Sequence, residues 1–491
     1  MWHKIMYTIA KISKESVDSM IIGREEEIAK LNSAANSGKA EFVAVYGRRR
    51  IGKTFLIRQT FGRFSFEHTG IRKRGTAKQL EEFAKSLAAQ GYPRCKRPVD
   101  WYEAFDFLKE LLVGKGEGRK IVFLDECPWM DTPKSDFVGA LDHFWNGWAS
   151  ARSDIMLIIC GSATSWVIEK IVDDYGGLHN RLTRQIYLRP FTLSECEALV
   201  RANGHVMNRD QILEGYMIMG GVPYYWDLLR KDIGFAQNID ALFFAAHGEL
   251  SEEFDHLFLS LFRKPKLYIS IIRALGTRKC GMSRNEIIAA IGATGNGMLT
   301  RALKELAQCD FIRVYAEPGR RKRDLIYQLI DNYVLFYFRF IDGQTNLMPN
   351  FWSVSQTTQA VRVWCGLAFE RVALQHVAAI KRKLGISGVV TRTYGWRFQG
   401  DGETNSGAQI DFVIDRDDKV VNLCEMKYTA GPFSITDEYD RRLKVKREVY
   451  AEQTGTKSAI HLTMVSAHGL KANANAFDVQ SVITLDDLFR E

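Results

Sequence analysis

The chain has 491 residues, which is too long for a single hydrophobic core, so we expect about three domains. Its composition, with 46% hydrophobic and 25% charged residues, is typical of a soluble globular protein. No stretch approaches about eighteen uninterrupted apolar residues, and lysines interrupt the N-terminus, which argues against a membrane-spanning helix and a signal peptide.

The charge and the cysteines bear on partners and location. A net charge of +9 suggests contact with a polyanion. The 8 cysteines are scattered and form no C-x-x-C pair. That pattern argues against a disulfide framework and a structural zinc site, and it favours reduced thiols in a cytoplasm.

An octet that begins at Gly47, GRRRIGKT, fits the pattern G-x-x-x-x-G-K-[ST] of a phosphate-binding P-loop. An apolar run at 42–46 precedes it as a buried strand would, and residues 55–57 follow it as the start of a helix. Glycines let the backbone approach phosphate oxygens, and a helix N-terminus offers N–H groups. We therefore expect a nucleoside triphosphate to bind at Gly47, Arg48, Arg49, Arg50, Ile51, Gly52, Lys53 and Thr54.

Two residues of the octet and a downstream carboxylate pair predict the chemistry. Lys53 would reach the β- and γ-phosphates, and Thr54 would supply a hydroxyl to magnesium. Residues 121–124 form a short apolar pattern, typical of a strand, that ends in Asp125 and Glu126. At such a position an aspartate holds magnesium, and the following glutamate can orient and deprotonate the attacking water.

Other polar residues of this half have two interpretations each, and both stay open. A third apolar strand, 155–160, ends in the small polar run 161–165, which would place a hydroxyl beside the γ-phosphate or cap a turn. Arg24, at the start of an amphipathic helix, would lie near the nucleotide base or in solvent. Arg181 and Arg184 would add charge at the transferring phosphoryl group or remain on the surface.

Five segments occur in the order IIGREEE, VYGRRRIGKT, IVFLDECPWM, LIICGSATSW and GGVPYYW. Together they resemble the prokaryotic AAA-like ATPases of the archaeal-ATPase family, within the wider STAND and ORC-like group, over about residues 20–345. The resemblance implies an adenine rather than a guanine nucleotide, so the expected ligands are ATP and the magnesium ion of Thr54 and Asp125. It further implies a parallel sheet in which an extra strand separates the P-loop strand from the Asp-Glu strand. It also implies a helical lid that closes over the nucleotide and carries Pro223 in its G-x-P motif.

The next segment has the pattern of a winged helix-turn-helix. Ser283 and Glu286 form an S-x-x-E capping box, and a basic loop, 317–323, lies between two apolar segments. Such a unit contacts DNA through its second helix or packs against protein, and both interpretations stay open. The predicted elements are helices at 284–291 and 298–306 and strands at 311–314 and 325–329.

The C-terminal part carries three acidic residues and a lysine in a suggestive pattern. Asp411 precedes a turn, and alternation along the next strand places Glu425 and Lys427 on one face. Glu370, on a helix predicted over 359–384, would approach from upstream. Such a set can hold magnesium, activate a water and offset charge on a phosphate.

This set resembles the PD-(D/E)XK nuclease superfamily, in a domain that often accompanies such ATPases. The resemblance implies that Glu370, Asp411 and Glu425 bind a metal and that Lys427 is catalytic. The other interpretation is that these are ordinary surface charges on two half-exposed strands.

The predicted fold is α/β: a P-loop ATPase core with a parallel sheet, a helical lid, a winged helix and a C-terminal restriction-endonuclease-like α/β domain. The leading hypothesis is an ATP-binding and ATP-hydrolysing switch that acts on or near DNA, without membrane contact. The alternative is a signalling or scaffold ATPase whose C-terminal domains bind protein partners, or further copies of the chain, and do not cleave DNA. The expected parts are an N-terminal extension (1–19), the ATPase core (20–190), the lid (191–255), the winged helix (256–345) and the nuclease-like domain (346–491).

Overall fold

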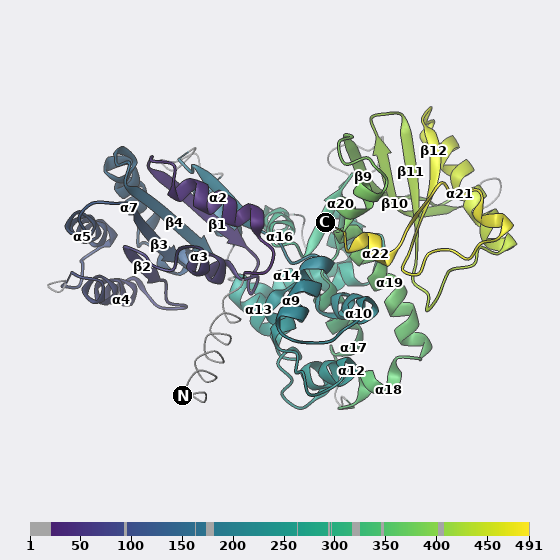
Figure 1. Ribbon diagram of the computed structural model, residues 1–491, viewed down its shortest axis with the longest axis horizontal. Coiled ribbons are helices and arrows are strands. Elements are labelled where there is room, and N and C mark those ends of the chain that lie inside the picture. Colours follow the sequence, from purple (N-terminus) through teal and green to yellow (C-terminus); the bar gives the residue numbers. More distant parts are fainter. Residues whose placement is uncertain are drawn as a thin grey trace, which may run out of the picture. The chain divides into compact units, whose positions relative to one another are not determined.

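The computed structural model forms two compact units, Met1–Pro190 and Phe191–Glu491, and each is described by itself (Figure 1). Across the described residues, no helix combines the length and the apolar character needed to cross a membrane. The basic loop 317–323 lies outside the described residues. These comprise 21–92, 96–162, 164–172, 181–262, 264–292, 295, 297–316, 325–344, 348–400 and 407–490.

The first unit is built on a five-stranded parallel sheet in the order β2-β3-β4-β1-β5 (Figure 1). Every residue of β1 and β4 is buried, as expected for central parallel strands that are covered on both faces. Strand β4 separates β1, which leads into the P-loop, from β3, which carries the Asp-Glu pair, so the predicted extra strand is confirmed. The strands are β1 (Glu41–Gly47), β2 (Phe66–Thr69), β3 (Lys120–Asp125), β4 (Ile155–Gly161) and β5 (Arg184–Leu188).

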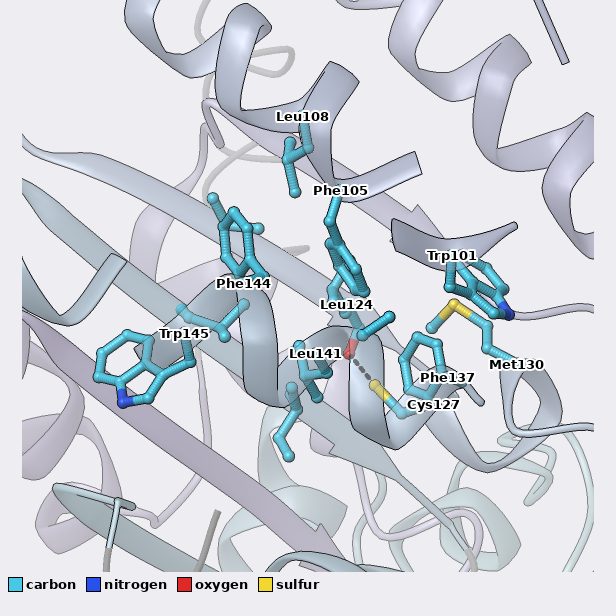
Figure 2. Close-up of a cluster of buried hydrophobic side chains, with 14 of the residues drawn as sticks. Trp101, Phe105, Leu108, Leu124, Cys127, Met130, Phe137, Leu141, Phe144 and Trp145 are labelled. Atoms are coloured by element: carbon cyan, nitrogen blue, oxygen red, sulfur yellow. Dashed lines mark hydrogen bonds between the residues drawn. The ribbon is translucent and has the colours of Figure 1, made fainter. Parts of the chain in front are cut away.

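Two apolar clusters bury the two faces of this sheet. Helices α2 and α3 contribute to one cluster, and α4, α5 and α7 contribute to the other. Figure 2 shows the second cluster, which includes Phe137 of α7, Trp101 of α5 and Leu124 of β3. The ring centroids of Phe137 and Trp101 lie 5.0 Å apart. This core holds the end of β3 in place. The helices are α2 (Glu25–Ala35), α3 (Lys53–Phe61), α4 (Thr76–Ala89), α5 (Trp101–Gly114), α6 (Cys127–Met130), α7 (Phe137–Gly147), η1 (Ala149–Ala151), α8 (Thr164–Val167) and η2 (Ile168–Val172).

The second unit begins with a group of helices that lead to an aromatic helix, α17 (Asn332–Phe340). Asp331 caps α17, because its carboxylate accepts a hydrogen bond from Val334 N at 2.7 Å. Helix α17 packs against α10, α14 and α19, so the apolar run at 331–341 joins the helices upstream and downstream of it. The helices upstream are α9 (Leu193–Ala202), α10 (Arg209–Met219), α11 (Pro223–Asp227), α12 (Phe235–Ile239), η3 (Asp240–Phe244), α13 (Glu253–Leu261) and α14 (Pro265–Gly276).

A small antiparallel sheet in the order β6-β8-β7 follows α14. The predicted capping box is confirmed: the Ser283 hydroxyl accepts from Glu286 N, and the Glu286 carboxylate accepts from Ser283 N. Tyr315 and Ile326 of this small sheet share an apolar cluster with Tyr394 of the C-terminal sheet. The elements are β6 (Met282–Ser283), α15 (Arg284–Ile291), α16 (Gly297–Gln308), β7 (Ile312–Tyr315) and β8 (Ile326–Leu329).

The C-terminal sheet is mixed, in the order β13-β12-β11-β10-β9. Strands β9, β10 and β11 are antiparallel, and β11, β12 and β13 are parallel. The register of β10 against β9 shifts between Ile410 and Val413, and such an irregularity can redirect a side chain. Its elements are α18 (Phe351–Ser355), α19 (Gln359–Gln375), α20 (Val377–Lys383), β9 (Thr391–Phe398), β10 (Ala408–Arg416), β11 (Val420–Lys427), α21 (Asp437–Thr454), β12 (Ala459–Ser466), η4 (Ala474–Ala476), β13 (Ser481–Ile483) and α22 (Leu485–Leu488).

The prediction of a single helix over 359–384 is wrong. The structure contains two helices there, α19 and α20, which meet at His376. The buried His376 ring donates from Nδ1 to the carbonyl oxygen of Val372 at 2.7 Å, and its Nε2 accepts from Leu193 N at 2.9 Å. A side chain that binds nearby backbone competes with the regular helix pattern. The ring thereby fixes the start of α9 to the end of α19.

This ring predicts a pH dependence of stability. Burial lowers the pKa of His376 from 6.5 to about 4, so the unfolded chain binds the proton first as the pH falls below 6.5. The free energy of unfolding should therefore decrease between pH 6.5 and 4, by up to on the order of 3 kcal/mol. Denaturant unfolding at several pH values should show a smaller decrease for His376→Gln, whose amide oxygen can still accept from Leu193 N. An unchanged pH slope in this variant would contradict the assignment.

Candidate functional site

The P-loop connects β1 to α3 and requires an unusual backbone. Gly47 has φ 144°, and a Cβ atom there would lie 2.4 Å from the carbonyl oxygen of Leu188. Arg50 and Gly52 follow with φ of 67° and 86°, in the left-handed region. Glycine adopts these angles without a steric penalty, so the two glycines of the motif allow the loop to turn back over the end of β1. The loop therefore lies at the carboxyl edge of the parallel sheet.

Lys53 is the first residue of α3 and is only 5% exposed. Its ammonium group donates to the carbonyl oxygens of Gly47 at 3.0 Å and Arg48 at 2.8 Å. These two hydrogen bonds hold the Lys53 side chain against the backbone of the P-loop. The N-terminus of α3 and this ammonium group together provide the N–H groups and the positive charge that bind a phosphate chain.

Thr54 and Asp125 meet although 71 positions separate them in the chain. The Thr54 hydroxyl donates to Asp125 Oδ2 at 2.9 Å, and Asp125 Oδ1 accepts from the backbone N–H of Glu126 at 2.9 Å. A hydroxyl and a carboxylate are hard oxygen ligands of the kind that magnesium prefers. The two predicted magnesium ligands therefore lie side by side, and their chemistry fits that ion.

Glu126 lies beside the end of the neighbouring strand β4. Its backbone is left-handed, with φ 50°. The Ser162 hydroxyl donates to Glu126 Oε1 at 2.5 Å, and Ser162 N donates to Oε2 at 3.3 Å. This arrangement of Ser162 differs from both interpretations of the polar run 161–165. Its hydroxyl and its N–H group instead hold the carboxylate of Glu126, the predicted catalytic residue.

The remaining residues predicted for the nucleotide are spread more widely. Arg24 is buried at the start of α2 and donates to the carbonyl oxygen of Arg189 at 2.7 Å. Pro223 is the first residue of α11 in the second unit, and its contact with the nucleotide stays a prediction. Arg184 begins β5 at the sheet edge opposite the P-loop, and its guanidinium lies 3.8 Å from the Glu41 carboxylate. That position does not favour the phosphoryl-transfer role considered for it.

In the second unit, the carboxylates of Glu370 and Asp411 meet at a lysine that sequence reasoning missed. Lys279 Nζ lies 2.8 Å from Glu370 Oε1 and 3.1 Å from Asp411 Oδ1. Lys279 precedes β6 in the small sheet, whereas Glu370 lies on α19 and Asp411 on β10. Nothing in the local pattern around Lys279 marks it, because only the tertiary fold brings these segments together.

The other two residues of the predicted nuclease set contact helix α21. Lys446 donates to Glu425 Oε1, and the Tyr439 hydroxyl donates to Glu425 Oε2 at 3.1 Å. The Lys427 ammonium lies 5.2 Å from the centre of the Tyr439 ring. Over the described ranges, no group of three or more His, Cys, Asp or Glu side chains is arranged to hold a metal ion. The metal role of Glu370, Asp411 and Glu425 and the catalytic role of Lys427 stay predictions.

Burial and charge set opposite pKa shifts at the paired carboxylates. Burial and the nearby charge of Asp411 raise the pKa of Glu370 to about 7, against the effect of Lys279. Burial also acts to raise the pKa of Asp411, but the charge of Lys279 and hydrogen bonds outweigh it, and the pKa is lowered. Both side chains are poorly solvated, since they are 8% and 11% exposed, and this burial acts to raise the pKa of each.

Comparison with known sequences finds a family match for residues 21–229. Residues 21–229 match a family described as an ATPase domain predominantly from Archaea. An uncharacterized protein of Methanocaldococcus jannaschii is 26% identical over 460 residues, which cover 88% of this chain and 91% of that protein. An uncharacterized ATP-binding protein of the same organism is 45% identical over 40 residues, which cover 8% of this chain and 68% of that protein.

Two solved structures show a distant likeness. A Walker-type ATPase of Pyrococcus abyssi is 18% identical, with a TM-score of 0.47, and the match covers 65% of this chain and 96% of that one. The ORC2 protein of Aeropyrum pernix is 14% identical, with a TM-score of 0.42, and the match covers 73% of this chain and 96% of that one. The family match at 21–229 and the P-loop geometry agree with each other, since both indicate an ATPase-type fold for this part of the chain.

Proposed function

We propose that this protein is an ATP-hydrolysing switch that acts on or near DNA. One observation carries the ATPase part: Lys53, Thr54, Asp125 and Glu126 lie together at the carboxyl edge of one parallel sheet. That edge is where parallel α/β sheets bind ligands, and these residue types are the ones that phosphoryl transfer requires.

Each of these residues has a distinct task. Lys53 binds the β- and γ-phosphates in exchange for the carbonyl oxygens that it now contacts. Thr54 and Asp125 would hold magnesium, which when bound neutralises charge on the phosphate oxygens. Glu126 takes a proton from the attacking water, and Ser162 keeps its carboxylate in position.

In this proposal the second unit responds to ATP binding and hydrolysis and acts on DNA. In this proposal the helices at 191–255 form a lid, Pro223 meets the nucleotide, and hydrolysis repositions the downstream modules. DNA would contact the exposed side of α16, where Arg301 and Lys304 lie. Glu370, Asp411, Glu425 and Lys427 would then form a magnesium-dependent nuclease site.

One observation favours the alternative, a scaffold ATPase that binds protein and does not cleave DNA. Lysines already neutralise the carboxylates, since Lys279 binds Glu370 and Asp411 and Lys446 binds Glu425. The small sheet of β6, β7 and β8 also shares its apolar cluster with the C-terminal sheet, as a packing module would. DNA binding and DNA cleavage therefore need separate tests.

Lys53→Ala should abolish ATP binding, because the variant loses the ammonium group that contacts the phosphates while the loop glycines remain. Direct titration with ATP by calorimetry measures this. Lys30→Ala, a change to an exposed lysine on α2, is the matched control and should bind ATP as the wild type does. Equal ATP affinity in the Lys53 variant would refute the assigned site.

Ser162→Ala should lower the ATP turnover number by about tenfold, less than Glu126→Gln, because a positioned general base contributes roughly 10²–10⁴-fold to a rate. The dissociation constant for ATP should change little in both variants. Ser162→Thr, which keeps the hydroxyl, should retain most of the activity. Full turnover in Ser162→Ala would show that Glu126 does not depend on this contact.

DNA affinity measured over a series of salt concentrations separates the two functions. Phosphate contacts predict a steep loss of affinity with salt, and Lys304→Ala should reduce the slope of log K against log salt by about one. Lys30→Ala should leave the slope unchanged. A scaffold predicts little DNA binding at any salt concentration.

DNA cleavage can be measured on the same samples with magnesium or manganese. Cleavage that is abolished by Asp411→Asn would support the nuclease function.

A further inference from the structure

Lys279, in the turn between α14 and β6, places a positive charge beside the carboxylates of Glu370 and Asp411. Its ammonium group bridges Glu370 Oε1 at 2.8 Å and Asp411 Oδ1 at 3.1 Å. Glu370 comes from α19 and Asp411 from the irregular part of β10, so the lysine joins three separate segments. A single ammonium group thus serves as the shared counter-ion of two carboxylates.

The exposed fractions of the three side chains show which of them can move into solvent. The Glu370 and Asp411 side chains are 8% and 11% exposed, whereas the Lys279 side chain is 34% exposed. The carbonyl oxygen of Lys279 accepts from Gln328 Nε2 at 2.6 Å and from Arg371 Nη2 at 2.7 Å. The backbone is therefore held on both sides, while the long side chain has a path to water. The two carboxylates are largely shielded from water, and the Lys279 ammonium group lies within 3.1 Å of both.

One buried acceptor in this cluster is not satisfied by the lysine. Glu370 Oε2 is buried and has no hydrogen-bond partner among the described residues. The Glu370 residue lines a small pocket together with Lys279, Asp411, Arg371 and Tyr315. A lysine donates along three fixed directions, whereas a divalent cation gathers several oxygens around itself at short range. The unsatisfied oxygen is the kind of ligand that a cation would use.

We propose that the Lys279 ammonium occupies the position of a divalent cation, so that the lysine and the cation exclude each other at Glu370 and Asp411. The proposal rests on the proposed metal-dependent function of this carboxylate set. Both cations need the same two carboxylates, and their like charges cannot share one poorly solvated pocket. Arg371 and Lys446, which also lie near the pair, add to this repulsion.

The exclusion gives the small sheet control over the C-terminal site. Lys279 lies between α14 and β6, upstream of the domain that carries the carboxylates. The site is closed while Lys279 stays inside, and it opens to a metal when the side chain moves into solvent. The lysine is thus an autoinhibitory contact between two modules of one unit.

Binding of manganese to the full-length chain, followed by electron paramagnetic resonance in the absence of nucleotide, tests the proposal. Lys279→Met removes the charge and should tighten manganese binding about tenfold or more, because the competing cation is gone. Lys279→Arg keeps the charge and is the matched control, with affinity like that of the wild type. Adding Asp411→Asn to Lys279→Met should abolish the gain. If the Met variant does not fold, Lys279→Gln serves the same purpose.

Thermal unfolding provides a second readout that does not depend on activity. Lys279→Met leaves two buried carboxylates without their counter-ion, so its Tm should fall, and manganese should restore it. Manganese should have little effect on the Tm of the wild type and of Lys279→Arg.

The outcomes distinguish this proposal from the function on which it rests. Equal manganese affinity in the wild type and Lys279→Met, lost with Asp411→Asn, would overturn the exclusion and leave the metal site intact. Binding by neither protein would overturn both the exclusion and the metal-dependent nuclease. The ATPase function would be unaffected in either case, because Lys53→Ala tests it separately.

Discussion

The carboxyl edge of the first parallel sheet is the constraint on which the nucleotide site depends. Strands β1, β4 and β3 lie next to one another and run in the same direction, so the segments that leave them emerge at one edge. The P-loop, Ser162 and the Asp-Glu pair are these segments. The contact from Ser162 to Glu126 joins the ends of the neighbouring strands β4 and β3, and the contact from Thr54 to Asp125 joins the P-loop side of β1 to β3, beyond the intervening β4. The apolar cores on both faces keep the strands in register and thereby preserve this geometry.

The sequence was enough to locate the P-loop and the Asp-Glu pair, because both are short local patterns. A P-loop needs fixed residues at fixed spacing, and an apolar strand ending in two carboxylates is visible in a short window. The position of β4 between β1 and β3 followed from the resemblance and is confirmed. The pairing of Ser162 with Glu126 was missed, because a serine at a strand end is compatible with several partners until the neighbouring strand is known.

The C-terminal half shows where such prediction ends. The hairpin of β10 and β11 and the capping box of α15 depend on local patterns, and both were predicted. The break at His376 depends on Leu193, which is 183 positions away in the chain, and no local signal announces it. Lys279 is a similar case: its two carboxylate partners belong to later segments that only tertiary packing brings together. The residue types alone favoured a metal site, whereas in the folded chain lysine side chains lie beside these carboxylates.

The close fit between Gly47 and Leu188 couples the backbone of the P-loop to the path by which the chain leaves the first unit. Leu188 ends β5 two positions before Pro190, and Arg24 grips the carbonyl oxygen of the next residue, Arg189. With no room for even one methyl group at Gly47, the exit segment cannot shift toward the loop without deforming it. A displacement of the segment that leads out of the first unit would therefore also strain the backbone of the P-loop.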